Sequence, residues 1–280
     1  MNNINLEYKK NIAPIIKWAG GKKQILPIIK YYIPKEISLY YEPFIGGGSV
    51  LFNLQPQKAI INDINSELIN LYKVVKENVE ELLKDLIKHK NEEEYFYFIR
   101  SLDRDENFLN KYTDVQRASR FIFLNKTCFN GMYRVNSRGY FNTPFGNYKQ
   151  SFTINCDIIR AVNKYFNEFD IGFKNTDFEN VITKIEKDTF VYFDPPYDTD
   201  KNNFTEYSKY GFDRNDQKRL KKLCDKLTKL KVKFLLSNSS TDFIMDLYKD
   251  YNIENINVKR FISADKNGRK GASEVLIKNY

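Results

Sequence analysis

The chain has 280 residues, is 42% hydrophobic and 15% aromatic, and carries a formal net charge of +9 with a pI of about 9.1. This length supplies a sizeable core for one large or two smaller domains. The basic charge favours a polyanionic partner, although it fits a merely soluble basic protein equally well. Three widely spaced cysteines and a single histidine argue against a disulfide framework and a metal site.

Targeting signals and catalytic histidines are not expected. Residues 1–10 are polar, so we expect no signal peptide, and no apolar stretch is long enough to span a bilayer. We therefore expect a cytoplasmic protein with reduced thiols. His89 lies between Lys88 and Lys90 at the end of a helical pattern, which predicts a solvated surface residue.

The first half of the chain predicts two strand–helix units followed by further helices. Residues 39–44 predict a strand that leads into Gly46-Gly47-Gly48 and a helix at 49–54. Residues 58–63 predict a second strand, and Asn65 or Ser66 can cap the next helix. Charge-rich helical patterns continue to about residue 125.

The second half begins with a change of character. Residues 126–150 mix β-type residues with arginine, asparagine and aromatics, and Asn130-Gly131 is a hairpin turn signal. Strand patterns return at 170–174, 189–193, 232–237 and 274–278, and 212–230 predicts a helix capped by Asp213. The order predicts an α/β fold, a Rossmann-like doubly wound sheet with an inserted, mainly helical domain that carries a β-hairpin. We place the sheet domain at 1–65 and 156–280 and the insertion at 66–155.

The segment Asp194-Pro195-Pro196-Tyr197 directly follows the apolar run 189–193. The prolines must end this strand, because each lacks an N–H group and has a fixed φ. A carboxylate, a rigid turn and an aromatic ring therefore lie at the carboxyl end of a strand, where open α/β sheets bind ligands. This arrangement suits a flat ring that bears an amino group.

The glycine turn and Asp63 together suggest a nucleoside site. Glycines at 46–48 allow backbone N–H groups to approach a ligand, and Asp63 ends the next strand, where a carboxylate can take both ribose hydroxyls. A plain glycine-rich loop is the alternative. The dinucleotide fingerprint is not met, since residue 51 is Leu, which argues against nicotinamide or flavin binding.

Three further segments have both a structural and a functional interpretation. Trp18 is a core residue or, beside two glycines and two lysines, part of a backbone that wraps a ligand. Asp177-Phe178 is a helix cap or a contact to an adenine amino group with aromatic packing. Residues 129–138 are an ordinary basic hairpin or a base reader, with arginine for guanine, asparagine for adenine and an aromatic wedge.

These segments in this order resemble the Dam-like DNA adenine-N6 methyltransferases of the alpha class, and the resemblance covers nearly the whole chain. The motifs that carry it are Lys17-Trp18-Ala19-Gly20-Gly21-Lys22, Glu42-Pro43-Phe44-Ile45-Gly46-Gly47-Gly48-Ser49, Asn62-Asp63-Ile64-Asn65, Phe129-Asn130-Gly131-Met132-Tyr133-Arg134-Val135-Asn136, Phe141-Asn142-Thr143-Pro144-Phe145-Gly146 and Asp194-Pro195-Pro196-Tyr197.

The resemblance implies a class I S-adenosylmethionine-dependent methyltransferase fold. The domain at 1–65 and 156–280 would bind S-adenosylmethionine and catalyse transfer, and 66–155 would recognise the target. The activity implied is methyl transfer to N6 of an adenine flipped out of duplex DNA, in the family's usual site GATC. The implied partners are double-stranded DNA and a cognate restriction endonuclease in the same system, with the enzyme a monomer or weak dimer and no membrane involved.

The resemblance also implies residue roles. Asp194 and the Pro195 carbonyl would accept the N6 hydrogens, Tyr197 would stack on the target base, Asp63 would hold the ribose and Asp177 the cofactor's adenine edge. The catalytic set is Asp194, Pro195, Pro196 and Tyr197. The cofactor set is Trp18, Ala19, Gly20, Gly21, Lys22, Pro43, Phe44, Gly46, Gly48, Asp63, Ile64, Asp177, Phe178 and Asp194. The DNA set is Lys17, Phe129, Asn130, Met132, Arg134, Asn136, Arg138 and Pro144.

Three alternatives remain open at this point. The same chemistry could act on a longer adenine-containing site. It could act on cytosine N4 or RNA, although cytosine-N4 enzymes of this general fold more often carry Ser in place of the first Asp of the motif. The chain could also be a non-enzymatic DNA-binding module with a vestigial cofactor pocket, against which the intact Asp194, Tyr197 and Asp63 argue.

Overall fold

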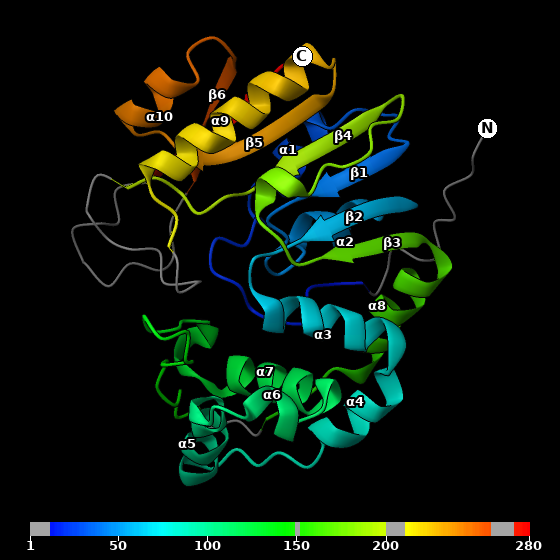
Figure 1. Cartoon of the computed structure of the whole chain (residues 1–280), viewed down its shortest axis with the longest axis vertical. Helices are drawn as coiled ribbons and strands as arrows, with labels where there is room; N and C mark the ends of the chain where they lie inside the picture. The colour runs from blue at the N-terminus through cyan, green and yellow to red at the C-terminus, as the bar shows by residue number, and fades with distance from the viewer. Residues whose placement is uncertain (1–11, 149–151, 200–210, 259–271) are drawn as a thin grey trace.

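Seven strands form one sheet in the order β3-β2-β1-β4-β5-β7-β6, and Figure 1 shows helices on the sheet and a second group of helices below it. The computed structural model describes residues 12–148, 152–199, 211–258 and 272–280. The segment 1–10, in which we expect no signal peptide, lies outside the described residues. The strands are β1 (Leu39–Glu42), β2 (Lys58–Asn62), β3 (Asp170–Lys174), β4 (Thr189–Phe193), β5 (Lys233–Ser239), β6 (Asn252–Val258) and β7 (Ala272–Lys278).

The sheet is doubly wound, as the sequence predicts. β3, β2, β1, β4 and β5 are parallel, and β7 is antiparallel to both β5 and β6. The strand order reverses direction between β1 and β4, where Tyr41 pairs with Val191. Such a switch point opens a crevice at the carboxyl ends of the strands, and the fold class predicted from the sequence is confirmed.

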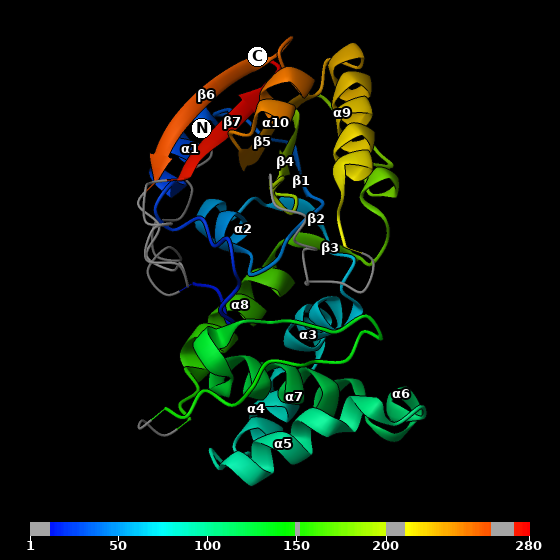
Figure 2. The same ribbon diagram turned by 90° about the vertical axis from the view of Figure 1, so that its left-hand side faces the viewer.

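Alternation along the strands explains why helices cover both faces of the sheet (Figure 2). Leu39 and Tyr41 of β1 pack with α9 and α10, whereas Tyr40, between them, packs with α1, α2, α3 and α8. Successive strand residues point to opposite faces, so a strand with both faces covered must be apolar throughout. The helices described are α1 (Leu26–Tyr32), α2 (Ser49–Leu54), α3 (Ser66–Glu77), α4 (Val79–Leu86), α5 (Glu93–Ser101), α6 (Phe108–Lys111), α7 (Asp114–Thr127), α8 (Cys156–Glu168), α9 (Arg214–Lys229) and α10 (Asp242–Leu247).

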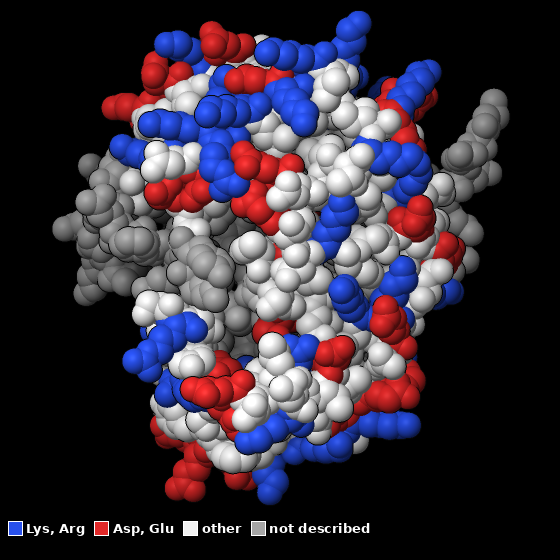
Figure 3. All heavy atoms as spheres, viewed as in Figure 1, with Lys and Arg blue, Asp and Glu red and all other residues white. Residues whose placement is uncertain are grey.

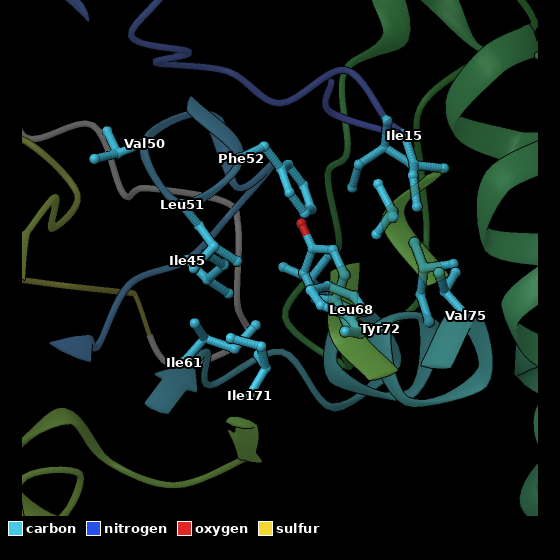
Figure 4. Packing of buried hydrophobic residues seen from close by; sticks show 14 of the residues in the cluster. Ile15, Ile45, Val50, Leu51, Phe52, Ile61, Leu68, Tyr72, Val75 and Ile171 are labelled. Carbon is cyan, nitrogen blue, oxygen red and sulfur yellow. The ribbon is translucent and has the colours of Figure 1, made fainter. Parts of the chain in front are cut away.

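Helix α3 joins the sheet to the helical group. The Tyr72 hydroxyl donates to the Gly46 carbonyl at 2.7 Å, and its ring meets Phe52 edge-on, as Figure 4 shows. Further along the same helix, the Asn70 amide donates to the Asp114 carbonyl at the start of α7, at 2.9 Å. The helical group is therefore fixed to the glycine turn through buried contacts. The domain division at 66–155 stays a prediction.

Most predicted elements occur where they are expected. The strands predicted at 170–174 and 189–193 have these bounds, Asn65 caps α3 by accepting from the Leu68 N–H group, and Asp213 caps α9. Helices α1 and α10 and strand β6 were not predicted individually. Among the described residues, no helix combines the length and apolar character needed to cross a bilayer.

The hairpin is present, but its predicted turn is wrong. Asn130 and Gly131 have φ values of 56° and 64° and turn the chain out of α7. The hairpin closes further on, where the Asn136 N–H donates to the Tyr140 carbonyl at 2.9 Å and Val135 pairs with Phe141. The Asn-Gly pair therefore does form a turn, in the 3-10 helix η3 (Phe129–Gly131) that follows the extended C-cap of α7 at Cys128, but this turn does not close the hairpin.

The prediction for His89 is also wrong. Its ring is half-buried and stacks on Phe123, with ring centroids 4.5 Å apart. Nδ1 lies 2.9 Å from the Tyr95 hydroxyl, and Nε2 lies 3.0 Å from the Ser119 hydroxyl. Burial lowers the pKa of His89 to about 4, so the ring is neutral at pH 7. The flanking lysines suggested an exposed residue. The sequence does not show that α5 and α7, which are separate segments, cover the His89 ring.

Candidate active site and DNA-reading surface

Two predicted motifs meet at the switch point. The glycine turn follows β1, and Asp194-Pro195-Pro196-Tyr197 follows β4, its direct parallel neighbour. Parallel neighbours end at the same edge, so the two turns face the same crevice. The sheet thus brings together segments that are far apart in the sequence.

Asp63 supports the glycine turn from the end of β2. Its Oδ2 accepts from the Gly46 N–H at 3.1 Å, and its Oδ1 accepts from the Asn65 N–H at 3.0 Å. Gly46 has a φ of 46°, and a Cβ atom here would lie 2.7 Å from Cδ1 of Trp18, so only glycine allows this packing. Burial raises the pKa of Asp63 to about 6.

Asp63 can still bind a diol. An ionised carboxylate has about four lone-pair positions, and the two backbone N–H groups use two of them. The Asp63 side chain is half-buried beside Ile64, which is 47% exposed. These residues fit a ribose whose two hydroxyls donate to the carboxylate.

Asp194 forms a buried ion pair with Lys22. The Lys22 Nζ lies 2.7 Å from Asp194 Oδ1 and donates to the Gly20 carbonyl at 2.7 Å, and Lys22 is only 4% exposed. Burial raises the pKa of Asp194 above its ordinary value, and the Lys22 ammonium opposes this rise. The pair keeps a carboxylate in a site where an isolated charge would be costly.

Two further carboxylates surround this pair. Glu42, at the end of β1, is 2% exposed and accepts from the Tyr40 hydroxyl at 2.8 Å, and burial raises its pKa well above the ordinary value. Glu274, on β7, accepts from the Tyr197 hydroxyl at 3.2 Å. The Lys22 Nζ also lies 4.7 Å from the centroid of the Tyr197 ring. The carboxylate and the aromatic ring predicted from the sequence are therefore both held by neighbours.

Asp177 lies beside the packed aromatic rings of Phe44 and Phe178. Asp177 caps the 3-10 helix η4 (Phe178–Asn180) by accepting from the Glu179 N–H, and its Oδ1 also pairs with Arg219 at 2.8 Å. The Phe178 ring lies 5.4 Å from Phe44, and the Arg219 guanidinium lies over Phe178 at 4.9 Å. Among the described residues, both polar contacts of the Asp177 carboxylate fall on Oδ1. The cap interpretation is thus observed, and it leaves Oδ2 as an acceptor beside aromatic rings.

Lys17 and the predicted base reader are joined by Asn125 of α7. The Asn125 amide donates to the carbonyls of Lys17 and Gly131 at 2.8 and 3.1 Å, and its oxygen accepts from the Lys17 N–H at 2.9 Å. A Cβ atom at Gly131 would lie 2.6 Å from Cδ of Lys17. Phe129 is 51% exposed beside this contact. Lys17, Phe129 and Asn130 therefore lie on one exposed surface.

The remaining predicted residues are placed as follows. Trp18 stacks on Tyr133 at 5.3 Å, so the segment at 17–22 contacts the hairpin directly. The Pro144 carbonyl accepts from the Phe129 N–H at 2.9 Å, which places Pro144 beside Phe129. Arg134 Nε donates to Asn142 at 2.8 Å, and the Asn136 side chain accepts from two N–H groups of its own turn. Pro43 is buried, Met132 is half-buried, and Ala19, Gly20, Gly21 and Arg138 are exposed.

Sequence reasoning missed several residues of this site. Glu274 and Arg219 contact predicted site residues, Glu42 interacts electrostatically with Asp194 and Lys22, and Phe212 lies 5.8 Å from Phe178. Glu42 carried a usable signal, because an acid directly before Pro43 at the end of an apolar strand must be buried with a partner. Glu274 and Arg219 carried none, since only the packing of β7 and α9 brings them to the site.

Charge on the surface is mixed. On the face shown in Figure 3, Lys and Arg side chains alternate with Asp and Glu, so the net charge of +9 is not gathered into one basic patch there. The DNA assignment therefore depends on the exposed reader residues more than on a general basic surface.

Comparisons with known proteins agree with this geometry. A family described as D12 class N6 adenine-specific DNA methyltransferase matches residues 18–262. The Type II methyltransferase M1.LlaDCHI of Lactococcus lactis subsp. cremoris is 41% identical over 99% of both chains. The Type II methyltransferase M.MjaIII of Methanocaldococcus jannaschii is 42% identical over 96% of this chain and 99% of its own. A DNA adenine methylase of Salmonella typhi is 34% identical over 96% and 95%.

Proposed function

The chain belongs to the D12 class of N6 adenine-specific DNA methyltransferases, and on this premise we propose that it methylates adenine within GATC, using S-adenosylmethionine. The proposal adds the donor, the recognition site and the residue roles to the family's adenine-N6 chemistry. The observation that carries it is the meeting of the glycine turn, Asp63 and Asp194 at the β1–β4 switch point.

The donor set fits S-adenosylmethionine. We assign Asp63 to the ribose hydroxyls, the Asp177 carboxylate to the adenine amino group, and the packed Phe44–Phe178 ring pair to one side of the purine. The Trp18 side chain packs directly against Gly46 and Gly47 of the glycine turn. When bound, the cofactor supplies a methyl group on a sulfonium, which needs no activating base.

The target amine would meet acceptors on the turn after β4. The Asp194 carboxylate and the Pro195 carbonyl accept the two N6 hydrogens, which draws the nitrogen lone pair out of the ring and towards the methyl group. Tyr197 stacks on the base, and Glu274 fixes its hydroxyl. Once N6 carries the methyl group and a positive charge, one N6 proton leaves through Asp194 to water. Lys22 favours the ionised form of Asp194, and in our proposal the carboxylate serves first as an acceptor.

The DNA contacts would come from the helical and hairpin segment. Phe129 would intercalate between two base pairs. Lys17, Asn130, Met132 and Arg134 would contact base edges. Asn136, Arg138 and Pro144 complete the surface. Two relatives are named Type II methyltransferases, which supports a role beside a cognate restriction endonuclease. We further propose that the enzyme is a monomer or weak dimer.

The test is methyl transfer from labelled S-adenosylmethionine to two duplexes that differ only in GATC or a one-base variant of it. We expect transfer to GATC, with N6-methyladenine as the product in the digested nucleosides. Asp194→Ala should abolish transfer while the fold and cofactor binding stay largely intact, with a lower melting temperature because Lys22 loses its buried partner. Equal transfer to both duplexes would overturn the recognition site, and an active Asp194→Ala variant would overturn the chemistry.

A further inference from the structure

The turn at 194–198 needs support from outside itself. Strand β4 ends at Phe193, and Pro195 and Pro196 have no N–H groups with which to bond to the rest of the fold. Methyl transfer requires reacting atoms to be held closely, and a displacement of about 1 Å can cost on the order of 100-fold in rate. The residues that hold this turn are therefore part of how the reaction works.

Two buried amides bridge the turn on both sides of Tyr197. Gln217 Nε2 donates to the Pro196 carbonyl at 2.9 Å, and its Oε1 accepts from Asn238 Nδ2 at 3.1 Å. The Asn238 Oδ1 in turn accepts from the Asp198 N–H at 3.1 Å. Gln217 is 1% exposed and Asn238 is 0% exposed. One chain of three hydrogen bonds thus joins the residue before Tyr197 to the residue after it.

Both amides stand on rigid elements. Gln217 lies in the first turn of α9, which Asp213 caps by accepting from two N–H groups. Asn238 lies on β5, where it pairs with Val275 of β7. Side chains on capped helices and on paired strands are held more precisely than side chains on loops. The bridge therefore transfers the geometry of α9 and β5 to the turn.

The Asp198 side chain ties the same end of the turn a second time. Its carboxylate pairs with Arg214 through two contacts of 2.9 and 3.1 Å and accepts from the Thr241 hydroxyl at 2.7 Å. The Ser239 hydroxyl donates to the Asp198 carbonyl at 2.6 Å. In contrast, the Pro196 carbonyl accepts from Gln217 alone among the contacts described. Gln217 is thus the sensitive link.

We propose that Gln217 and Asn238 are positioning residues for methyl transfer, which hold the peptide planes on both sides of Tyr197. This inference rests on the proposed function, because it takes Asp194 and the Pro195 carbonyl as the acceptors of the target amine. With the Pro196 carbonyl and the Asp198 N–H both fixed, the Tyr197 ring and the adjacent Pro195 carbonyl have one orientation. Loss of the bridge should slow the chemical step and leave ligand binding intact.

The test uses Gln217→Glu, which keeps the shape of the side chain but places a carboxylate, with no N–H donor, against the Pro196 carbonyl. With saturating cofactor and duplex, we expect single-turnover methyl transfer to be slower by about 30- to 100-fold. Dissociation constants for cofactor and DNA, measured separately, should change by less than about threefold. Gln217→Met removes the same donor without burying a charge, so it repeats the test if the first variant does not fold.

Asn238→Asp sharpens the assignment. It removes the donor to Gln217 but keeps the acceptor for the Asp198 N–H, so we expect a smaller loss, about 10-fold in the single-turnover rate. The matched control is Asn279→Asp. Asn279 donates to the Val232 carbonyl and the Thr228 hydroxyl, and so joins the same β5 and α9 segments at their far end. It should lower thermal stability without changing the single-turnover rate.

The outcomes separate this inference from the function on which it rests. Rates for both Gln217 variants within threefold of the parent would overturn it, as would an equal loss of rate in Asn279→Asp. Asp194→Asn serves as the reference. If Asp194→Asn is inactive while the Gln217 variants are fully active, only the positioning role fails. If Asp194→Asn is itself active, the proposed chemistry fails.

Discussion

The sheet edge and the reader segment at 129–144 differ in how deeply their functional side chains are buried. At the edge, charges are buried in pairs: Lys22 is 4% exposed and lies 2.7 Å from Asp194. In the reader segment, Phe129 is 51% exposed, and its neighbours are held by backbone bonds and by side chains such as Asn125 and Arg104. Chemistry needs groups fixed in a dry site, whereas recognition needs side chains that are free to meet DNA.

The comparison teaches that the two regions should fail in different ways. Removing a charge at the edge leaves another charge buried and unpaired, so both chemistry and stability should suffer. Removing an exposed side chain from the reader segment should leave the fold unchanged and weaken only the recognition of DNA. The predictions that follow test this contrast, from the largest expected effect to the smallest.

Replacing Lys22 should have the largest effect. In Lys22→Met, Asp194 loses the cation that opposes its upward pKa shift, so its pKa rises further. At pH 7 we expect kcat to fall by about 100-fold. Because the carboxylate must ionise to accept N–H groups, the pH–rate profile should shift to higher pH. Measurement of kcat from pH 6 to pH 9 checks this, and a slower enzyme with the parent profile would contradict it.

Replacing Phe129 should affect duplex DNA alone. Phe129→Ala removes the wedge, and we expect kcat/KM on a paired duplex to fall by about 10- to 30-fold, with the melting temperature unchanged. A duplex with a mismatch opposite the target adenine should restore most of the rate, since less unpairing is needed. Phe98→Ala is the matched control, because Phe98 on α5 is 59% exposed. Equal losses of kcat/KM in the two variants would contradict the proposed contact of Phe129 with DNA.

Replacing His89 should have the smallest effect, which is on the pH dependence of folding stability. Its pKa is lowered to about 4 in the fold, against about 6.5 in an unfolded chain. The unfolded state therefore binds the proton more readily between these values, and folding stability falls as the pH drops through this range. In His89→Gln, we expect about 2–3 kcal/mol less acid destabilisation between pH 7 and pH 4. Urea unfolding at both pH values measures this, and identical pH dependence in the two proteins would contradict it.

Sequence patterns predict the edge better than the reader segment. The strands at 170–174 and 189–193 occur with these bounds, and 189–193 was the clearer of the two, because this strand is buried throughout and reads as an apolar run, whereas 170–174 is an edge strand. Since parallel strands end at one edge, the placement of Asp63 and Asp194 there follows from the order of the elements. The partners of these acids do not follow, because no local pattern shows that Lys22 pairs with Asp194.

The reader segment was predicted less well for a physical reason. It is held by single bridges and side-chain contacts, so periodicity carries little information. Asn130-Gly131 was predicted as the hairpin turn, yet it turns the chain at the end of α7, and the hairpin closes at Asn136. The burial of His89 also escaped prediction, because its partners lie on other helices.

The position of β7 also has a consequence for the order of assembly. β7 follows β6 in the sequence but lies between β5 and β6 in the sheet. During synthesis, β6 therefore has no neighbouring strand until β7 has emerged and inserted, and until then β5 presents an open edge. Glu274, which holds the Tyr197 hydroxyl, arrives with that same strand. The proposed reader segment at 129–144 is thus synthesised well before the strand that completes the catalytic edge.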